Sequence, residues 1–443
     1  MASHLQKLAV GLAAAVGLYA VLIGVLLTPE AQRLYANKFH TLRWKDVHRG
    51  EPYGFAKHQV TPFHLPTRDG EILYAWHILP LDQYVRHEAA ILQEARPPNA
   101  VVPDLTQTTA FKLLTSNHPS PARVVVSFHG NAGHVAQGQR AATNRYMATQ
   151  PNTHVFTVDY RGFGHSTGAP TETGLIVDGV ALVSWIVSVC NIPPERIVIY
   201  GHSLGTAVSA AVALHFADPG NTENPSAVQT LYPLRGTSAV GYPSTFAGIV
   251  LAAPFDSIPT LLLTYRVGGL VPLLLPLRPF SFAVELLNNF VDTWNTANRL
   301  REYYHVLEGN PDLYSGTRIT GSVQIIHALN DADIPFHQTE LICQNVLRQQ
   351  SLDARVPDSD ELEAHETIKG SEGAAVLRVR REGSPSLRFE FVEHGGHNRV
   401  ITYAPVAAAV FRAFEGLLTS AVTEGEEQEG KVQAEHCRSE GGI

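Results

Sequence analysis

The sequence predicts an α/β fold, in which a mostly parallel central sheet is covered by helices on both faces. Short apolar runs that end at a glycine or a polar turn recur along the chain, as at 123–130 and 196–203. Helical patterns lie between such runs, at 174–189 and 207–216. The chain has 443 residues, of which 44% are hydrophobic, so it can form one large domain with insertions or two smaller domains. Strands that alternate with helices form parallel sheets, whose sites lie at the carboxyl ends of the strands.

Charge and cysteine content narrow the class of protein. The net charge is -8, which gives no indication of nucleic-acid binding. The cysteines Cys190, Cys343 and Cys437 are odd in number and far apart, so neither a disulfide framework nor a zinc cluster is indicated. Residues 421–443 carry an excess of glutamate, and we expect them to form a disordered acidic tail.

The first element expected along the chain is a membrane anchor. Residues 8–27 carry no charge, and twenty residues at about 1.5 Å each span a hydrocarbon core of about 30 Å. No small-residue cleavage site follows, so we expect a retained transmembrane helix, with a cleaved signal or a buried helix as alternatives. Residues 28–57 are expected to form a tether. Basic residues flank the span on both sides, which leaves its orientation open.

The α/β domain is expected over residues 58–420. It begins with an antiparallel pair of strands, at 58–66 and 71–80. The remaining strands are expected within the runs 123–130, 154–162, 196–203, 247–254, 322–331 and 387–397, each of which includes the turn residues that end the strand.

Segments of a different character interrupt this order. Three of them have the composition of loop insertions, at 81–121, 220–245 and 350–386. A fourth, at about 255–315, is strongly apolar but is broken by prolines, which excludes an ordinary spanning helix. We interpret it as a cap over the site, with additional core helices as the alternative.

Two segments fit the pattern Gly-x-Ser-x-Gly, which can hold a nucleophilic serine: GHSTG at 164–168 and GHSLG at 201–205. Ser203 directly follows an apolar strand and directly precedes a helical run with small residues. This strand, sharp turn and helix form a nucleophile elbow, which needs small neighbours such as Gly201 and Gly205. Ser166 lacks that context, and we expect it to lie in a turn beside the site.

A serine needs a base, and the base needs an orienting carboxylate, which follow the serine in that chain order. Asp331 comes just after an expected strand, and His397 lies in a glycine-containing loop after the last strand. Asp256 and Asp333 are alternative acids. We expect His394 to be a surface residue and His202 to pack beside the serine rather than act as the base.

An oxyanion hole requires two backbone donors. The Leu204 N–H, next to the serine, is one natural donor. The HGNAG segment at 129–133 follows a strand, and its glycines permit close approach of the backbone. We therefore assign the second donor to Asn131, with Ala132 as the alternative, and expect His129 and Gly130 to support the loop.

These residues give the chain a resemblance to the serine α/β-hydrolases, and within them to the group of ABHD12, ABHD13 and Bem46. The resemblance covers about residues 50–420. It is carried by HGNAG (129–133), DYRGFGHSTGAPTETGL (159–175), GHSLG (201–205), LAAPFDS (251–257), DADIP (331–335) and GGHN (395–398).

The resemblance implies an α/β-hydrolase fold with nucleophile Ser203, acid Asp331 and base His397. It also implies an N-terminal anchor, a location in the endoplasmic reticulum, and esterase activity on monoacylglycerols or lysophospholipids. The insertions depart from the pattern of the group and leave the acyl chain and head group open.

The sequence thus predicts a membrane-anchored serine hydrolase that cleaves carboxylic esters of lipids. The chemistry requires no metal and no cofactor. A protein S-acyl thioesterase or a peptidase would use the same triad and is one alternative. A non-catalytic membrane adaptor with this fold is the alternative from another class. The oligomeric state is left open.

Overall fold

The computed structural model of the chain describes residues 2–26, 28, 46–95, 101–116, 120–231, 243–264, 274, 292–310, 320–352, 365–369, 375–379 and 387–416.

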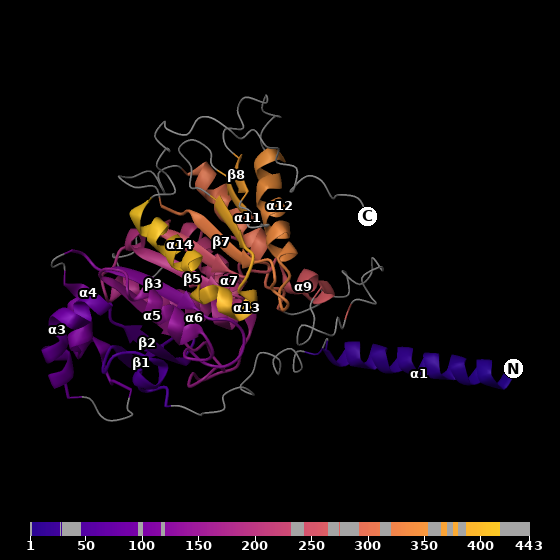
Figure 1. Cartoon of the computed structure of the whole chain (residues 1–443), viewed down its shortest axis with the longest axis horizontal. Helices are drawn as coiled ribbons and strands as arrows, with labels where there is room; N and C mark the ends of the chain where they lie inside the picture. The colour runs from indigo at the N-terminus through magenta and orange to yellow at the C-terminus, as the bar shows by residue number, and fades with distance from the viewer. Residues whose placement is uncertain are drawn as a thin grey trace.

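A central sheet organises the molecule (Figure 1), with the strand order β1-β2-β4-β3-β5-β6-β7-β10-β9-β8. The strands are β1 (Val60–Pro66), β2 (Ile72–Ile78), β3 (Arg123–Phe128), β4 (Thr153–Val158), β5 (Ile197–His202), β6 (Gly248–Ala252), β7 (Val323–Ala328), β8 (His365–Lys369), β9 (Ala375–Val379) and β10 (Leu387–Val392). Pairing is parallel from β4 through β3, β5, β6 and β7 to β10. It is antiparallel at both ends, among β1, β2 and β4 and among β10, β9 and β8. The prediction of a mostly parallel sheet is confirmed.

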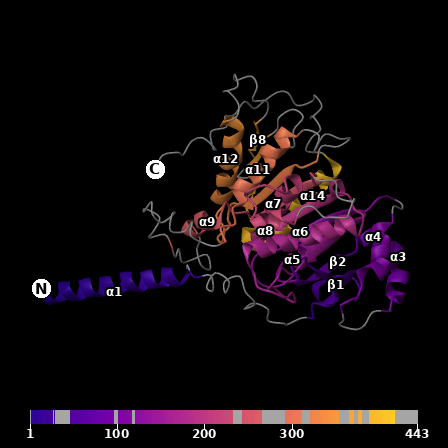
Figure 2. The same cartoon turned by 180° about the vertical axis from the view of Figure 1, so that it is seen from behind.

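Helices cover both faces of the sheet. They are α3 (Leu81–Gln93), α4 (Thr109–Thr115), α5 (Arg140–Met147), α6 (Glu172–Ser188), α7 (Leu204–Ala217), α8 (Ser226–Gln229), α9 (Ile258–Thr264), α11 (Thr296–Gly309), α12 (His337–Leu352), α13 (Gly396–Arg399) and α14 (Ala404–Glu415). Helix α14 lies toward the viewer in Figure 1 and behind the sheet in Figure 2.

Alternate side chains of the strands contribute to two hydrophobic clusters. Along β5, Ile197 and Ile199 pack with α6, α7 and α11, whereas Val198 and Tyr200 pack with α5 and α14. This alternation follows from the two-residue period of a strand. Because both faces are covered, the central strands are largely apolar and appear in the sequence as nearly continuous apolar runs, which buried polar residues such as Thr157, Gln324 and His327 interrupt.

Helix α1 (Ala2–Leu26) projects from the α/β domain in Figures 1 and 2, and Leu8, Val10 and Leu18 on it are exposed. The predicted anchor at 8–27 falls on this helix, apart from Leu27, which lies outside the described residues. Among the residues that the structure describes, no helix has the length and apolar character needed to cross a membrane. The structure therefore does not support the predicted transmembrane helix, and the location in the endoplasmic reticulum stays a prediction.

The segment predicted as a tether is in part integral to the domain. Residues 29–45 lie outside the described residues, but Val47 and Phe55 are buried in the same cluster as Trp76. The Val47 carbonyl accepts hydrogen bonds from Tyr74 Oη and Trp76 Nε1, at 2.8 and 3.0 Å. The end of the tether thus packs on β2, a long-range contact that its own composition did not indicate.

The structure differs from the expectation of a loop insertion at 81–121. This segment contains helices α3 and α4, and Tyr84, Ile91 and Ala110 form a small buried cluster with Leu79. Burial of a large apolar side chain contributes about 1.5–3 kcal/mol. The loop prediction was wrong here because it weighed the polar composition and overlooked the few apolar residues that give α3 a buried side.

The other segments are described only in part. The 220–245 insertion contains α8, and residues 232–242 lie outside the described residues. In the 350–386 insertion, β8 and β9 form an antiparallel hairpin that extends the sheet from β10, which differs from the predicted loop. Within the proposed cap at 255–315, most of the apolar middle lies outside the described residues, as do the tail residues 421–443. Helix α11, at its end, is packed into the main core through Leu300, Tyr303 and Leu307.

Candidate active site

Ser203 occupies the sharp turn between β5 and α7. Its backbone has φ 52° and ψ -120°, a conformation that residues other than glycine adopt only when the surrounding structure enforces it. The Ser203 N–H donates to the Ala252 carbonyl of the neighbouring β6 at 3.0 Å. The serine therefore lies at the N-terminus of a buried helix, where the helix dipole favours negative charge.

The turn is possible only because glycine occupies the positions two residues before and two residues after the serine. A Cβ at Gly205 would lie 2.1 Å from the Phe128 carbonyl oxygen at the end of β3. A Cβ at Gly201 would lie 2.4 Å from the Gly205 carbonyl oxygen. Both distances are far below a van der Waals contact, so strand β3, the turn and α7 could not pack this closely with any other residue at these positions.

His397 connects Ser203 to a buried carboxylate. Its Nε2 lies 3.0 Å from Ser203 Oγ, and its Nδ1 lies 2.8 Å from Asp331 Oδ2. His397 comes from α13, after β10, and Asp331 follows β7. These strands end at the same edge of the sheet as β5, because all three are linked by parallel pairing through β6. Residues far apart in sequence thus form one hydrogen-bonded row.

The surroundings of Asp331 keep its carboxylate ionised. Its Oδ1 accepts the backbone N–H groups of Asp333 and Ile334, both at 2.9 Å. Burial acts to raise the pKa of Asp331, but hydrogen bonds from His327 and His397 outweigh it and hold this pKa well below its ordinary value. A negative charge at this point favours the His397 tautomer with its proton on Nδ1 and leaves Nε2 to accept from Ser203.

The alternative acids and base lie in other surroundings. Asp256 Oδ2 accepts from Ser257 Oγ and Thr260 Oγ1, at 3.1 and 2.8 Å, beside the start of α9. Asp333 donates its N–H to Asp331. The His394 side chain is 72% exposed and lies 3.4 Å from Glu393. The structure therefore brings together Asp331 and His397 with Ser203.

His202 contacts the loop that carries His397. Its Nε2 donates to the His397 carbonyl at 3.0 Å, and the two rings lie 5.0 Å apart. Burial, with a contribution from the nearby His397, lowers the pKa of His202 to about 3. The neutral His202 ring, whose Nε2 already donates to this carbonyl, therefore orients the His397 backbone.

The HGNAG segment passes directly beside the serine. A Cβ at Gly130 would lie 3.2 Å from Ser203 Cβ, so the backbone approaches the serine closely. His129 Nδ1 donates to the Gly130 carbonyl at 2.8 Å, and Tyr160 Oη donates to the His129 carbonyl at 3.1 Å. Leu204 is the first residue of α7, and the first N–H groups of a helix lack intrahelical acceptors. The candidate donors, the N–H groups of Leu204 and Asn131, thus lie on the two segments that flank Ser203.

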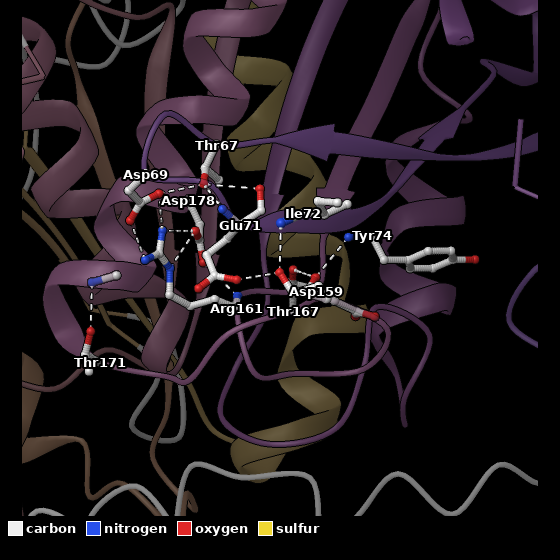
Figure 3. Close-up of polar contacts among 12 residues, drawn as sticks. Thr67, Asp69, Glu71, Ile72, Tyr74, Asp159, Arg161, Thr167, Thr171 and Asp178 are labelled. Carbon is white, nitrogen blue, oxygen red and sulfur yellow. Dashed lines mark hydrogen bonds and ion pairs between the residues drawn. The ribbon is translucent and has the colours of Figure 1, made fainter. Parts of the chain in front are cut away.

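Ser166, in the other Gly-x-Ser-x-Gly segment, is used within the fold. Its Oγ donates to the Asp159 carbonyl and accepts the Tyr74 N–H at 2.9 Å, and its exposed fraction is 4%. Figure 3 shows this point of contact between the loop after β4 and strand β2. Nearby, Thr167 Oγ1 accepts the Ile72 N–H at 2.9 Å. The segment therefore fastens a loop to the antiparallel side of the sheet.

Arg161 on the same loop forms ion pairs with two carboxylates, drawn in Figure 3; Arg161 and Asp178 are buried, whereas the Asp69 side chain is 44% exposed. Arg161 donates from Nε to Asp178 at 2.9 Å and from Nη1 to Asp69 at 2.6 Å. Asp178 lies on α6, and Asp69 lies between β1 and β2. Burial acts to lower the pKa of Arg161, but its hydrogen bonds to both carboxylates raise it above its ordinary value. The DYRG part of the motif therefore serves as structural support beside the site, through Arg161.

Three residues at the site were not singled out from the sequence. Asn330 Oδ1 accepts the Gly396 N–H at 2.8 Å and fixes the His397 loop. His327 Nε2 lies 3.4 Å from Asp331 Oδ2, and Arg140 holds carbonyl groups of the HGNAG segment. Asn330 is next to Asp331 and His327 is four residues before it, so their positions could have indicated these two residues. Nothing around Arg140 in the sequence indicates a role for that arginine.

Comparison with known proteins identifies the family of the chain. The model of the alpha/beta hydrolase family matches residues 124–410. The chain belongs to the alpha/beta hydrolase family. This span contains Ser203, Asp331 and His397 and the strands from β3 to β10.

Curated relatives place the chain with the ABHD12 and Bem46 group. The lysophosphatidylserine lipase ABHD12 of Danio rerio is 29% identical over 200 residues, covering 45% of this chain and 46% of that protein. Human protein ABHD12B is 32% identical, over 27% of this chain and 32% of that protein. Protein bem46 of Schizosaccharomyces pombe is 33% identical, over 25% of this chain and 36% of that protein. The matched region thus spans less than half the length of each relative.

Two solved structures are also similar to the chain. An alpha-beta hydrolase from Vibrio vulnificus matches with a TM-score of 0.44 at 13% identity, over 80% of this chain and 81% of that chain. The Pyrococcus furiosus esterase Pf2001 matches with a TM-score of 0.41 at 12% identity, over 83% of this chain and 92% of that chain.

Proposed function

We propose that the protein is a serine hydrolase that cleaves carboxylic esters of lipids through Ser203, His397 and Asp331. The row of hydrogen bonds from Ser203 Oγ through His397 to Asp331, at 3.0 and 2.8 Å, carries this proposal. Nucleophile, base and orienting carboxylate meet in the geometry that such chemistry requires. Membership of the alpha/beta hydrolase family supports the reaction class, and the name of the ABHD12 relatives supports a lysophospholipid as the first substrate to test.

The reaction follows from the roles of the three side chains. His397 Nε2 takes the proton from Ser203 as the serine oxygen bonds to the acyl carbonyl carbon. The N–H groups of Leu204 and Asn131 stabilise the negative oxygen of the tetrahedral intermediate. The ester C–O bond breaks, and His397 returns the proton to the leaving alcohol. Water then attacks the acyl-enzyme by the same route and releases the fatty acid and free Ser203.

The proposal is tested by expressing the wild type, Ser203→Ala and Ser166→Ala in the same host. Each is labelled with a fluorophosphonate, and the lipids of each host are profiled. We expect the wild type and Ser166→Ala to label and Ser203→Ala not to label. Monoacylglycerols or lysophospholipids should be more abundant with Ser203→Ala than with the wild type.

Other outcomes separate the alternatives. A folded wild type that does not label would contradict the proposal and favour the adaptor. Loss of labelling in Ser203→Ala without any lipid change would contradict the lipid substrate while keeping the hydrolase chemistry. Thioester and peptide substrates would then be tested with the same pair of proteins.

A further inference from the structure

Arg140, the first residue of α5, holds the backbone of the HGNAG segment through its carbonyl groups. Its Nη2 donates to the Gly130 and Asn131 oxygens, at 2.9 and 2.8 Å. Its Nη1 donates to the His134 oxygen at 2.9 Å. One guanidinium therefore fastens three carbonyl groups of the loop that precedes its own helix.

The direction of these carbonyl groups determines the direction of the candidate oxyanion donors. In a trans peptide the C=O and N–H bonds point in opposite directions. The Gly130 carbonyl shares a peptide with the Asn131 N–H, and the Asn131 carbonyl shares one with the Ala132 N–H. Both N–H groups therefore point away from the guanidinium. Ala132 also has φ 57°, a conformation that a non-glycine residue adopts when its surroundings enforce it.

We propose that Arg140 is a positioning residue, which sets the orientation of the Asn131 and Ala132 N–H groups and thereby builds one half of the oxyanion hole. The inference rests on the proposed function, since the oxyanion forms only when Ser203 attacks an acyl carbonyl. Arg140 acts through the backbone and does not touch the reacting atoms.

Arginine is suited to this task because its planar guanidinium carries several donors in a fixed geometry. Lysine has one nitrogen on a flexible chain and could not hold the same three oxygens in one arrangement. Burial lowers the pKa of Arg140 to about 10, and the carboxylate of Asp159 opposes this shift. The group therefore remains charged at neutral pH, and its hydrogen bonds are charge-assisted.

The test compares Arg140→Lys and Arg140→Ala with the wild type. Loss of one oxyanion donor typically lowers kcat by about 10²–10³-fold, and we expect about 10²-fold with KM changed little. The rate of fluorophosphonate labelling of Ser203 should fall in parallel, since phosphonylation uses the same donors. Added guanidinium should partly restore the rate of Arg140→Ala.

Arg145→Ala is the matched control, because Arg145 lies on the same helix and donates to the Tyr53 carbonyl at 2.7 Å. It should keep the kcat of the wild type. Folded Arg140 variants with the kcat and labelling rate of the wild type would overturn the inference and leave the proposed function intact. A wild type that does not label would instead contradict the proposed function.

A separate observation concerns a cavity of about 10 Å³ beneath the candidate site, lined in part by His129, Arg140, Tyr200 and His202. Three buried polar atoms of these residues have no hydrogen-bond partner among the described residues: His129 Nε2, Tyr200 Oη and His202 Nδ1. The other nitrogen of each histidine donates to a carbonyl, of Gly130 and His397 respectively. Both nitrogens named above must therefore be acceptors.

The geometry points to a binding site for one water molecule in this cavity. A single tyrosine hydroxyl can donate to only one acceptor, whereas water donates to two and also accepts. A water that donates to His129 and His202 and accepts from Tyr200 would satisfy all three groups, and the volume is about that needed for one water. Such a water would link the HGNAG segment to the loop of His397.

A crystal structure at high resolution tests the water site. We expect ordered density within about 3 Å of the three atoms. In Tyr200→Phe, which removes the donor to this water, the density should weaken or disappear. A direct hydrogen bond from Tyr200 Oη to one of the two histidine nitrogens, without density in the cavity, would overturn this second inference.

Discussion

The two Gly-x-Ser-x-Gly segments share a five-residue pattern but place their serines in opposite chemical situations. The Ser203 hydroxyl lies against His397 Nε2 at 3.0 Å, at a strained turn. The Ser166 hydroxyl is engaged by the Asp159 carbonyl and the Tyr74 N–H. A serine can attack a substrate only when its proton can go to a base. The partner of the hydroxyl, and not the motif around it, therefore distinguishes the two serines.

The largest effect is expected when the two serines are replaced by alanine one at a time. For Ser203→Ala we expect kcat to fall by about 10⁶-fold, because the variant lacks the proposed nucleophile. Esterase assays with purified, folded protein would measure it. Activity retained in this variant and lost in Ser166→Ala would reverse our assignment.

The next largest effect is expected at the carboxylate. Asp331→Asn keeps the shape of the side chain but no longer favours the His397 tautomer with its proton on Nδ1, and kcat should fall by about 10⁴-fold. The same assay checks it. Asp256→Asn, at the alternative acid, is the matched control and should change kcat little. A large loss in the control alone would make Asp256 the acid.

A third prediction concerns the strained turn itself. Gly205→Ala places a Cβ 2.1 Å from the Phe128 carbonyl oxygen, so β3 and α7 must separate. We expect a loss of at least about 1–3 kcal/mol in the free energy of unfolding, measured by urea denaturation. Gly220→Ala is the control, since its Cβ would meet only Asp218 Oδ1, at 3.8 Å. Equal stability of the two variants would show that the turn adapts to a side chain.

The other serine should affect stability more than chemistry. Ser166→Ala leaves the buried Tyr74 N–H without its acceptor, and an unsatisfied buried group costs about 1–3 kcal/mol. The melting temperature should therefore fall, while kcat at low temperature stays within a few-fold of the wild type. A loss of kcat comparable to that of Ser203→Ala, in folded protein, would contradict the structural role.

Asp331, near Ser203, and Asp159, near Ser166, should make the free energy of unfolding depend on pH in opposite directions. Hydrogen bonds lower the pKa of Asp331, so its contribution is present above the unfolded value of about 3.9 and is lost as the pH falls through the folded value. Burial raises the pKa of Asp159 to about 7, although the His165 and Val135 N–H groups oppose it. The stabilising contribution of Asp159 to the free energy of unfolding is therefore fully present below about pH 3.9 and is lost as the pH rises toward about 7.

Urea denaturation of the wild type, Asp331→Asn and Asp159→Asn across this pH range would measure how the free energy of unfolding of each protein changes with pH. The stability advantage of the wild type over Asp331→Asn should shrink toward low pH. Its advantage over Asp159→Asn should shrink toward pH 7. If the stability advantage of the wild type over both variants changed with pH in the same direction, this prediction would be contradicted.

The strands of the parallel sheet, and the different surroundings of the two serines, could be predicted from the sequence. The apolar runs indicated the strands of the parallel sheet because burial on both faces favours apolar residues at most positions. The contrast between a strand directly before Ser203 and a loop before Ser166 was also local, since strand, turn and helix lie within a few residues. The positions of Asp331 and His397 after later strands could be predicted because the carboxyl ends of parallel strands meet at one edge.

Which groups touch, and which are held in place, depends on the tertiary fold. Tyr84 and Ile91 of the 81–121 segment are buried in one cluster with Leu79, which lies outside that segment, and with Ala110. The end of the tether is ordered by Tyr74 and Trp76, and Arg140 is given its role by the carbonyl groups that face it. These contacts depend on how the backbone passes in space. A periodic pattern specifies which residues are buried, but not which polar group a buried or half-buried side chain will meet.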